Sequence, residues 1–202
     1  MAIRTERELD QEVHRILRAL DMWRVPVDPF VIAREEEIEL APGEYGPKFD
    51  ARIEFLAPIQ HFAIYYKQSG ADRTDGRVRF SLGHELAHFY LHRDNLVRGQ
   101  SHNSLADFRA WNSVEQEADE FAARLLMPKE LFVEAVHRYR QRVCILSELC
   151  HLAENVFHTS LTSTVRRYCQ SDIEPASMVI SQNGDVKSQS QRSRELRISR
   201  GV

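Results

Sequence analysis

The sequence predicts an α+β fold that is mostly helical, with a small antiparallel sheet ahead of a central helix and a further helical region after it. Three observations lead to this prediction. Apolar residues recur at helical spacing over most of the chain. Residues 51–66 are instead rich in β-branched and aromatic side chains, which favours short strands. Polar segments that contain glycine or proline separate these stretches and are typical of turns.

The amino-acid composition is that of a chain with enough apolar residues to bury a hydrophobic core. It has 202 residues, of which 43% are hydrophobic and 28% are charged, so we expect one domain of ordinary size, with or without a small appendage. The formal net charge of −3 provides no global basic field, and any contact with nucleic acid would have to be local. No apolar run approaches the roughly 18 residues that a membrane span needs.

The cysteines and the N-terminal residues both indicate a cytoplasmic protein. Cys144, Cys150 and Cys169 form no CxxC pair and include an odd thiol, which is typical of a reducing compartment. The first 13 residues are charged throughout and contain no apolar stretch of the kind that a secretory signal carries. We therefore expect a cytoplasmic location and no association with a membrane.

Two helices are expected before the strands. Thr5 and Glu8 form a capping-box pattern at the start of the first helix. The apolar stripe of this helix consists of Leu9, Val13, Ile16, Leu17 and Leu20. Asp28 is suited to the N-cap of the second helix, because Pro29 after it fits the first helical position.

Residues 51–66 are expected to form two short strands with Pro58 at their junction. The residues 40–50 before them are rich in proline and glycine and are typical of a connection. The polar residues 67–76 after them are typical of a turn, and a helix over about residues 79–92 follows.

The chain after this helix and a loop is expected to be helical up to about residue 168. The predicted helices cover about residues 104–127, 129–157 and 161–168, and Pro128 ends the first of them. Residues 175–187 are typical of a strand, an Asn-Gly turn and the start of another strand, and the polar tail 188–202 is expected to be loose. We expect three regions, at residues 1–130, 131–170 and 171–202.

The stretch RFSLGHELAHFYLH, residues 79–92, contains a metal-binding pattern. A helix advances about 3.6 residues per turn, so His84 and His88 lie on one face and can reach a single ion. Glu85 directly follows His84, so its side chain is rotated about the helix axis relative to His84 and lies beside that ion. In this HExxH arrangement two neutral histidines hold zinc, and the carboxylate takes a proton from the metal-bound water.

A catalytic zinc also requires a third protein ligand and an open position. The stretch VEQEADEFAARLLMP offers Glu115 and Asp119, which share a helical face at positions i and i+4. Glu115 can be the third ligand, and Asp119 can accept a hydrogen bond from the outer nitrogen of a ligand histidine. Glu117 is the rival ligand, but its side chain diverges from that of Asp119, so the spacing favours Glu115.

The two motif helices are expected to pack against each other. The second helix carries an apolar stripe made of Ala118, Phe121, Ala122, Leu125 and Leu126. Gly83 and Ala87 on the first helix are small enough to allow a close approach of the two helices.

Competing patterns fit less well. The metzincin form requires a glycine and a third histidine at the positions that Leu91 and Asp94 occupy here. His92 lies about 6 Å further along the helix axis than His88, so we expect a surface or core histidine. A pair of charged amphipathic helices with core histidines would explain each residue separately. It would not explain why all of these polar residues fall where one tetrahedral site needs them.

These motifs resemble those of the ImmA/IrrE family of metallopeptidases. The resemblance rests on RVRFSLGHELAHFYLH and VEQEADEFAARLLMPKELF, with support from VPVDPFVIA upstream, and it covers roughly residues 9–168. It implies a zincin-like domain with a gluzincin-like HExxH…ExxxD metal site. It also implies a cytoplasmic protease that cleaves or inactivates repressors with a Cro/C1-type helix-turn-helix, in a stress response, a mobile element or phage-like regulation.

The resemblance, carried over residue by residue, implies His84, His88 and Glu115 as ligands and Glu85 as the general base. Zinc is the expected metal, although this ligand set also suits manganese or another divalent ion. No residue stands out as the donor that would stabilise the transition state. The candidates left open are Tyr65, Tyr66, Tyr90, His61 and His102.

Residues 146–170 are predicted to form a helix, a turn and a helix, similar to the helix-turn-helix region that ImmA/IrrE proteins often carry. Arg166 and Arg167 could contact DNA phosphates. A helical pair of this kind more often completes the core of the protease, so DNA binding is the weaker alternative.

The sequence thus predicts a zinc-dependent endopeptidase of narrow specificity that acts on a helix-turn-helix repressor. One alternative is a non-proteolytic regulator, stabilised by its metal, that binds a repressor or DNA. Another is a zinc hydrolase or amidase acting on small substrates. Glu85 separates the first two, because a purely structural zinc site is usually closed by four protein ligands and has no use for such a carboxylate. The oligomeric state stays open.

Overall fold

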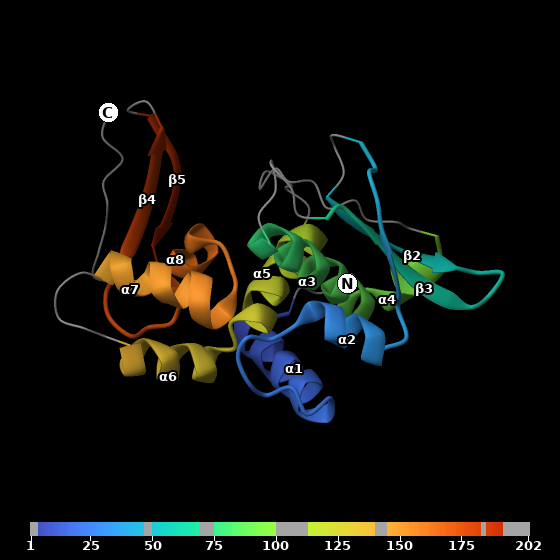
Figure 1. Cartoon of the computed structure of the whole chain (residues 1–202), viewed down its shortest axis with the longest axis horizontal. Helices are drawn as coiled ribbons and strands as arrows, with labels where there is room; N and C mark the ends of the chain where they lie inside the picture. Colours follow the sequence, from blue (N-terminus) through green and yellow to red (C-terminus); the bar gives the residue numbers. More distant parts are fainter. Residues whose placement is uncertain are drawn as a thin grey trace.

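The computed structural model describes residues 4–46, 50–68, 75–99, 113–139, 145–182 and 185–191. The predicted α+β class is confirmed, with helices as the main element. The helices are α1 (Glu6–Ala19), α2 (Pro29–Glu35), α3 (Asp75–Leu91), α4 (Arg93–Val97), α5 (Ser113–Leu126), α6 (Lys129–Tyr139), α7 (Ile145–His151), the π-helical η1 (Leu152–Phe157) and α8 (Leu161–Gln170). In Figure 1, α3 and α5 lie in the middle, with a sheet at one end of the molecule and a β-hairpin at the other.

The starts of the first two helices follow the predicted capping patterns. The hydroxyl of Thr5 accepts a hydrogen bond from the N–H of Glu8 at 3.3 Å, and the N–H of Thr5 donates to the Glu8 carboxylate at 2.7 Å. Asp28 accepts from the N–H of Phe30 at 3.0 Å, and Pro29 is the first residue of α2. Both patterns are local in the sequence, so they determine these starts without help from distant residues.

The later helices differ from the prediction at their ends. The motif helix α3 begins at Asp75, inside the stretch that was expected to be a turn. The start predicted for α5 near residue 104 lies outside the described residues, and the described helix begins at Ser113. The helical stretch predicted over residues 129–157 is divided between α6, α7 and η1.

The sheet ahead of the motif helix is mixed rather than antiparallel. As predicted, β2 (Ala51–Leu56) and β3 (His61–Tyr66) form an antiparallel pair joined by a turn. However, β1 (Glu39–Pro42) pairs parallel with β3, and the strand order is β1–β3–β2. The prediction of a connection was wrong for β1, because a short strand that contains proline is recognisable only from its distant partner.

The C-terminal hairpin is longer than predicted. β4 (Ser177–Gln182) pairs antiparallel with β5 (Asp185–Gln191). β5 therefore extends into the polar stretch that was expected to be loose, since strand pairing depends on main-chain hydrogen bonds that polar side chains do not prevent. The remainder of the predicted tail, residues 192–202, lies outside the described residues.

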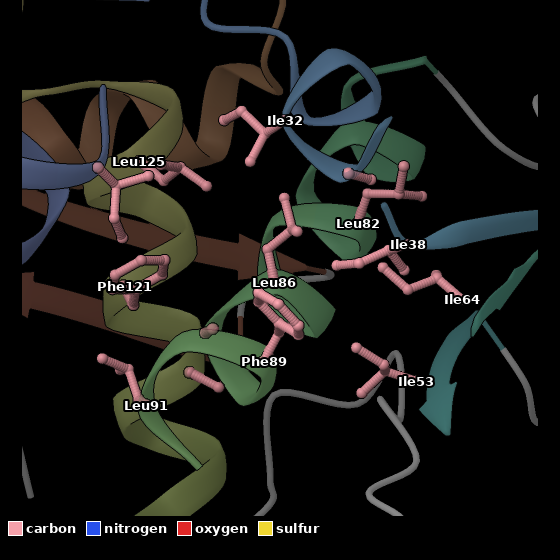
Figure 2. Packing of buried hydrophobic residues seen from close by; sticks show 14 of the residues in the cluster. Ile32, Ile38, Ile53, Ile64, Leu82, Leu86, Phe89, Leu91, Phe121 and Leu125 are labelled. Carbon is pink, nitrogen blue, oxygen red and sulfur yellow. The ribbon is translucent and has the colours of Figure 1, made fainter. Parts of the chain in front are cut away.

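The core of the domain surrounds α3. Figure 2 shows Leu86 and Phe89 of α3 in the middle of this core, with Phe121 of α5 on one side and Ile53 and Ile64 of the sheet on the other. Leu86 is fully buried, as are Ile53 and Phe121. A helix that is covered on several faces cannot shift easily, so the polar side chains of α3 are held in fixed positions.

A second apolar cluster begins where α5 ends. It is built mainly from α6, α7, η1 and α8 and contains Met127, Phe132, Leu149, Leu152, Phe157 and Tyr168. The division of the chain into regions near residues 130 and 170 stays a prediction. Within the described part of the chain, no helix is both long and apolar enough to span a bilayer.

Gly76 links the motif helix to this second region. A Cβ atom at this position would lie 2.8 Å from the carbonyl carbon of Thr159 and 2.9 Å from the nitrogen of Ser160. Both are main-chain atoms of the turn before α8, so the helix or the turn would have to shift. We expect Gly76→Ala to lower the free energy of unfolding by about 1–3 kcal/mol, as measured by urea denaturation.

Gly83→Ala is the matched control on the same helix. Its Cβ would lie 3.4 Å from the Cβ of Ala122 on α5, which is close to ordinary contact. Alanine also favours a helix over glycine by about 1 kcal/mol, so stability should be unchanged or raised. A Gly76→Ala protein as stable as the wild type would show that α3 does not pack against the Thr159 turn in solution.

Candidate metal centre

The two motif histidines lie on the face of α3 that packs against α5. His84 and His88 are one helical turn apart, and their relative exposures are 4% and 0%. The approach of the helices is close at Gly83, which has no side chain to separate it from Ala122. The expectation that small residues permit this packing is confirmed at Gly83, and it brings the acidic face of α5 to the histidines.

Three side chains converge on one point between the helices. The Nε2 atoms of His84 and His88 are 3.0 Å apart. A carboxylate oxygen of Glu115 lies 3.1 Å from the Nε2 of His84, and the other oxygen lies 3.6 Å from the Nε2 of His88. These residues form a group that could hold a metal ion.

The spacing of these atoms fits a tetrahedral zinc ion. Ligand atoms about 2.0–2.1 Å from the metal are separated by about 3.3 Å from one another in a tetrahedron. The separations of 3.0 and 3.1 Å from the Nε2 of His84 lie near that value, and the second oxygen of Glu115 is 3.6 Å from the Nε2 of His88. Among the described residues the group has three protein ligands, two histidines and one glutamate. Three protein ligands with an open fourth position are the arrangement of a catalytic rather than a structural zinc site.

Glu85 is buried next to this group and is tied to the sheet. Its relative exposure is 0%, and its carboxylate accepts a hydrogen bond from the main-chain N–H of Ile53 at 2.9 Å. The donor belongs to β2, whose position is determined by the sheet. The side chain that the sequence predicts as general base is therefore oriented by a main-chain donor.

Asp119 lies behind His84, on the side away from the convergence point. One of its carboxylate oxygens is 2.8 Å from the Nδ1 of His84. Burial lowers the pKa of His84, but hydrogen bonds to Asp119 and Glu115 and the charge of Glu85 outweigh it and raise the pKa to about 10. Metal binding at His84 would therefore compete with a proton.

Glu117, the rival third ligand, faces a different set of partners. Its carboxylate accepts a hydrogen bond from the N–H of Arg4 at 2.6 Å and lies 2.8 Å from the Nε2 of His92. It is not a member of the converging group. His92 is a core histidine with 2% exposure, one of the two environments expected for it.

The candidate donors for stabilising the transition state differ in the contacts that their side chains make. The hydroxyl of Tyr90 donates to Glu36 at 2.8 Å, and the ring of Tyr66 packs edge-on against Phe30. Both side chains are thus engaged with α2 or its neighbouring residue. The ring of Tyr65 packs against Tyr45. The choice among Tyr65, Tyr66 and His61 stays open, and His102 lies outside the described residues.

Arg167 is not available to DNA, which corrects the expected contact at this residue. Its relative exposure is 1%, and its Nε donates to the carbonyl of Met127 at 2.9 Å. The side chain faces the interior because the face of α8 that carries Arg167 packs against the end of α5. Arg166 is partly exposed, and a DNA contact there stays untested.

Comparisons with known proteins agree with the motifs. Residues 70–143 match the family model Peptidase_M78, described as the IrrE N-terminal-like domain. This match contains the motif helix and the three converging residues, and it confirms the resemblance that the sequence indicated. No curated protein matches the chain.

One solved structure with the same fold is that of a Mycobacterium tuberculosis transcriptional regulator. The two share 12% sequence identity with a TM-score of 0.60, over 92% of this chain. At that identity the likeness concerns the fold alone. This chain spans 55% of the length of that structure.

Proposed function

We propose that this chain, a member of the ImmA/IrrE metallopeptidase family through its IrrE N-terminal-like domain at residues 70–143, is a zinc-dependent endopeptidase of narrow specificity. Its target is a Cro/C1-type helix-turn-helix repressor that it cleaves or inactivates. The observation that carries the proposal is the buried Glu85 carboxylate beside a group that has three protein ligands among the described residues. A structural zinc site would be closed and would not need that carboxylate.

The proposed roles follow from the contacts of each side chain. His84, His88 and Glu115 would hold the metal, which supplies a Lewis acid that polarises the peptide carbonyl and acidifies water. Glu85 accepts a proton on its carboxylate and returns it to the leaving amine. The N–H of Ile53 keeps that carboxylate in place, and Asp119 keeps the Nε2 of His84 directed toward Glu115.

A regulatory setting is part of the same proposal. The family resemblance points to a repressor as substrate, and the similar solved structure is described as a transcriptional regulator. The cysteine usage supports a cytoplasmic location, and Cys150 and Cys169 are free thiols in the structure. Manganese or another divalent ion can replace zinc in this ligand set.

Metal removal tests the proposal directly. We expect the metal-loaded chain to cut the helix-turn-helix regulator encoded beside its gene, the chelated chain to leave the regulator intact, and added Zn²⁺ to restore the cut. Zinc at about 100 times its Kd should also stabilise the fold by about 2.7 kcal/mol. Gel electrophoresis of the regulator and thermal unfolding of the chain measure the two effects.

The control substrate is an unrelated unfolded protein, which a protease of narrow specificity should leave uncut. A metal-loaded chain that binds the regulator tightly without cutting it would favour the alternative, a non-proteolytic regulator that binds a repressor or DNA. Cleavage of the unrelated protein at a similar rate would contradict the narrow specificity.

A further inference from the structure

His88 has a second contact that the proposed chemistry does not use. While its Nε2 faces His84, its Nδ1 lies 3.0 Å from the Nδ1 of His92. Both rings are buried, with exposures of 0% and 2%. The two histidines are again one turn apart, at the end of α3 and just before α4.

The positions of the hydrogens follow from this contact. Two imidazole nitrogens 3.0 Å apart must share one hydrogen, so one donates and the other accepts. If the Nε2 of His88 is bare for a metal, its hydrogen is on Nδ1 and is donated to His92. The hydrogen of a neutral His92 then lies on Nε2, which is 2.8 Å from a carboxylate oxygen of Glu117.

Glu117 ends this chain of hydrogen bonds as a fixed acceptor. Its side chain is 5% exposed and accepts the main-chain N–H of Arg4 at 2.6 Å. The guanidinium of Arg4 lies 3.4 Å from the same carboxylate oxygen and also donates to the carbonyl of Leu91 at 3.4 Å. The carboxylate is thus held from two sides, and it can hold the ring of His92 in turn.

We propose that His92 and Glu117 are positioning residues of the metal centre, which hold His88 in the tautomer and orientation that direct its Nε2 at the metal. This inference rests on the metal site of the proposed function. The two ligand histidines then have different supports. His84 relies on Asp119, whose side chain is 37% exposed, whereas His88 relies on a chain of groups buried from water.

Two variants of His92 test the role through metal affinity. Leucine fills much of the space but offers no acceptor to His88, and we expect His92→Leu to weaken zinc binding by about 10- to 100-fold. Asparagine places its carbonyl oxygen near the position of Nδ1, so His92→Asn should bind zinc at least several-fold more tightly than His92→Leu. Competition with a chromogenic chelator measures both affinities.

A structural role would give a different result. Phe89→Leu, a buried change on the same helix away from the polar group, should lower the melting temperature without changing zinc affinity. If His92→Leu matched the wild type in zinc affinity, or if His92→Asn were as weak as His92→Leu, the positioning role would be overturned.

The wild-type chain provides a test that does not depend on the folding of a variant. Long-range ¹H–¹⁵N spectra of the zinc-loaded protein should show His92 with hydrogen on Nε2 and a bare Nδ1. Hydrogen on Nδ1 would overturn the inference. A chain that binds no zinc would overturn both proposals, whereas zinc binding with the expected tautomer but no regulator cleavage would overturn the proposed function alone.

Discussion

Replacement of Glu85 by glutamine is expected to leave the metal bound and to lower regulator cleavage by about 10²- to 10⁴-fold. Glutamine has nearly the same shape, and its carbonyl oxygen can still accept the N–H of Ile53, which contacts Glu85 at 2.9 Å. The amide cannot take a proton, however, so water is no longer activated. None of the converging atoms belongs to Glu85, and metal binding should therefore persist.

The measurement is the rate of regulator cleavage, with bound metal quantified in the same samples. Glu134→Gln is a suitable control, because Glu134 is exposed on α6 and pairs only with a neighbour on that helix, Arg138 at 2.5 Å, among the contacts described. It should cut at the wild-type rate. A metal-loaded Glu85→Gln protein that cuts as fast as the wild type would remove Glu85 from the mechanism.

Replacement of Asp10 by alanine should be the most destabilising of the changes considered. Asp10 on α1 lies 2.9 Å from the guanidinium of Arg124 and 3.6 Å from that of Arg167, and both arginines are 1% exposed. Burial lowers the pKa of Arg167 to about 10, with the charge of Arg124 as a further cause, so Arg167 remains charged at neutral pH. Without Asp10, two like charges stay buried together.

We expect Asp10→Ala to lower the free energy of unfolding by about 3 kcal/mol. This loss lies at the low end of the range expected when one partner of a buried ion pair is removed. The reason is that Glu120 still contacts Arg124 at 3.2 Å. Urea denaturation measures it, and Glu12→Ala on the same helix is the control. Glu12 pairs with the exposed Arg15 at 2.6 Å, and such a pair contributes less than about 1 kcal/mol. Equal losses in the two variants would show that Asp10 does not stabilise the arginines.

The arrangement of the candidate site could be predicted because its parts are local. His84 and His88 share a face through helix periodicity alone, and the same holds for Glu115 and Asp119. The one long-range step was the packing of α3 on α5, which the apolar stripe and Gly83 indicated. The structure brings the four side chains together, and their catalytic and metal-binding roles stay predictions.

The features that could not be predicted depend on distant partners. β1 pairs with β3 although β2 lies between them in the sequence, and nothing within Glu39–Pro42 indicates this pairing. Arg167 looked like a surface cation because its buried acceptor, the carbonyl of Met127, has no sequence signature. The place of His92 could have been found from its i+4 spacing to His88, but its link to Glu117 joins α5 to the end of α3.

The contacts of the N-terminal residues also bear on how the domain is made. Arg4 meets Glu117 across 113 positions of sequence, and Asp10 meets Arg124 across 114. At roughly 5–20 residues per second, a ribosome needs on the order of ten seconds between making α1 and making its partners. During that time the apolar stripe of α1 has no α5 to cover it. The proposed proteolytic activity is therefore expected to arise only after α5 has emerged from the ribosome.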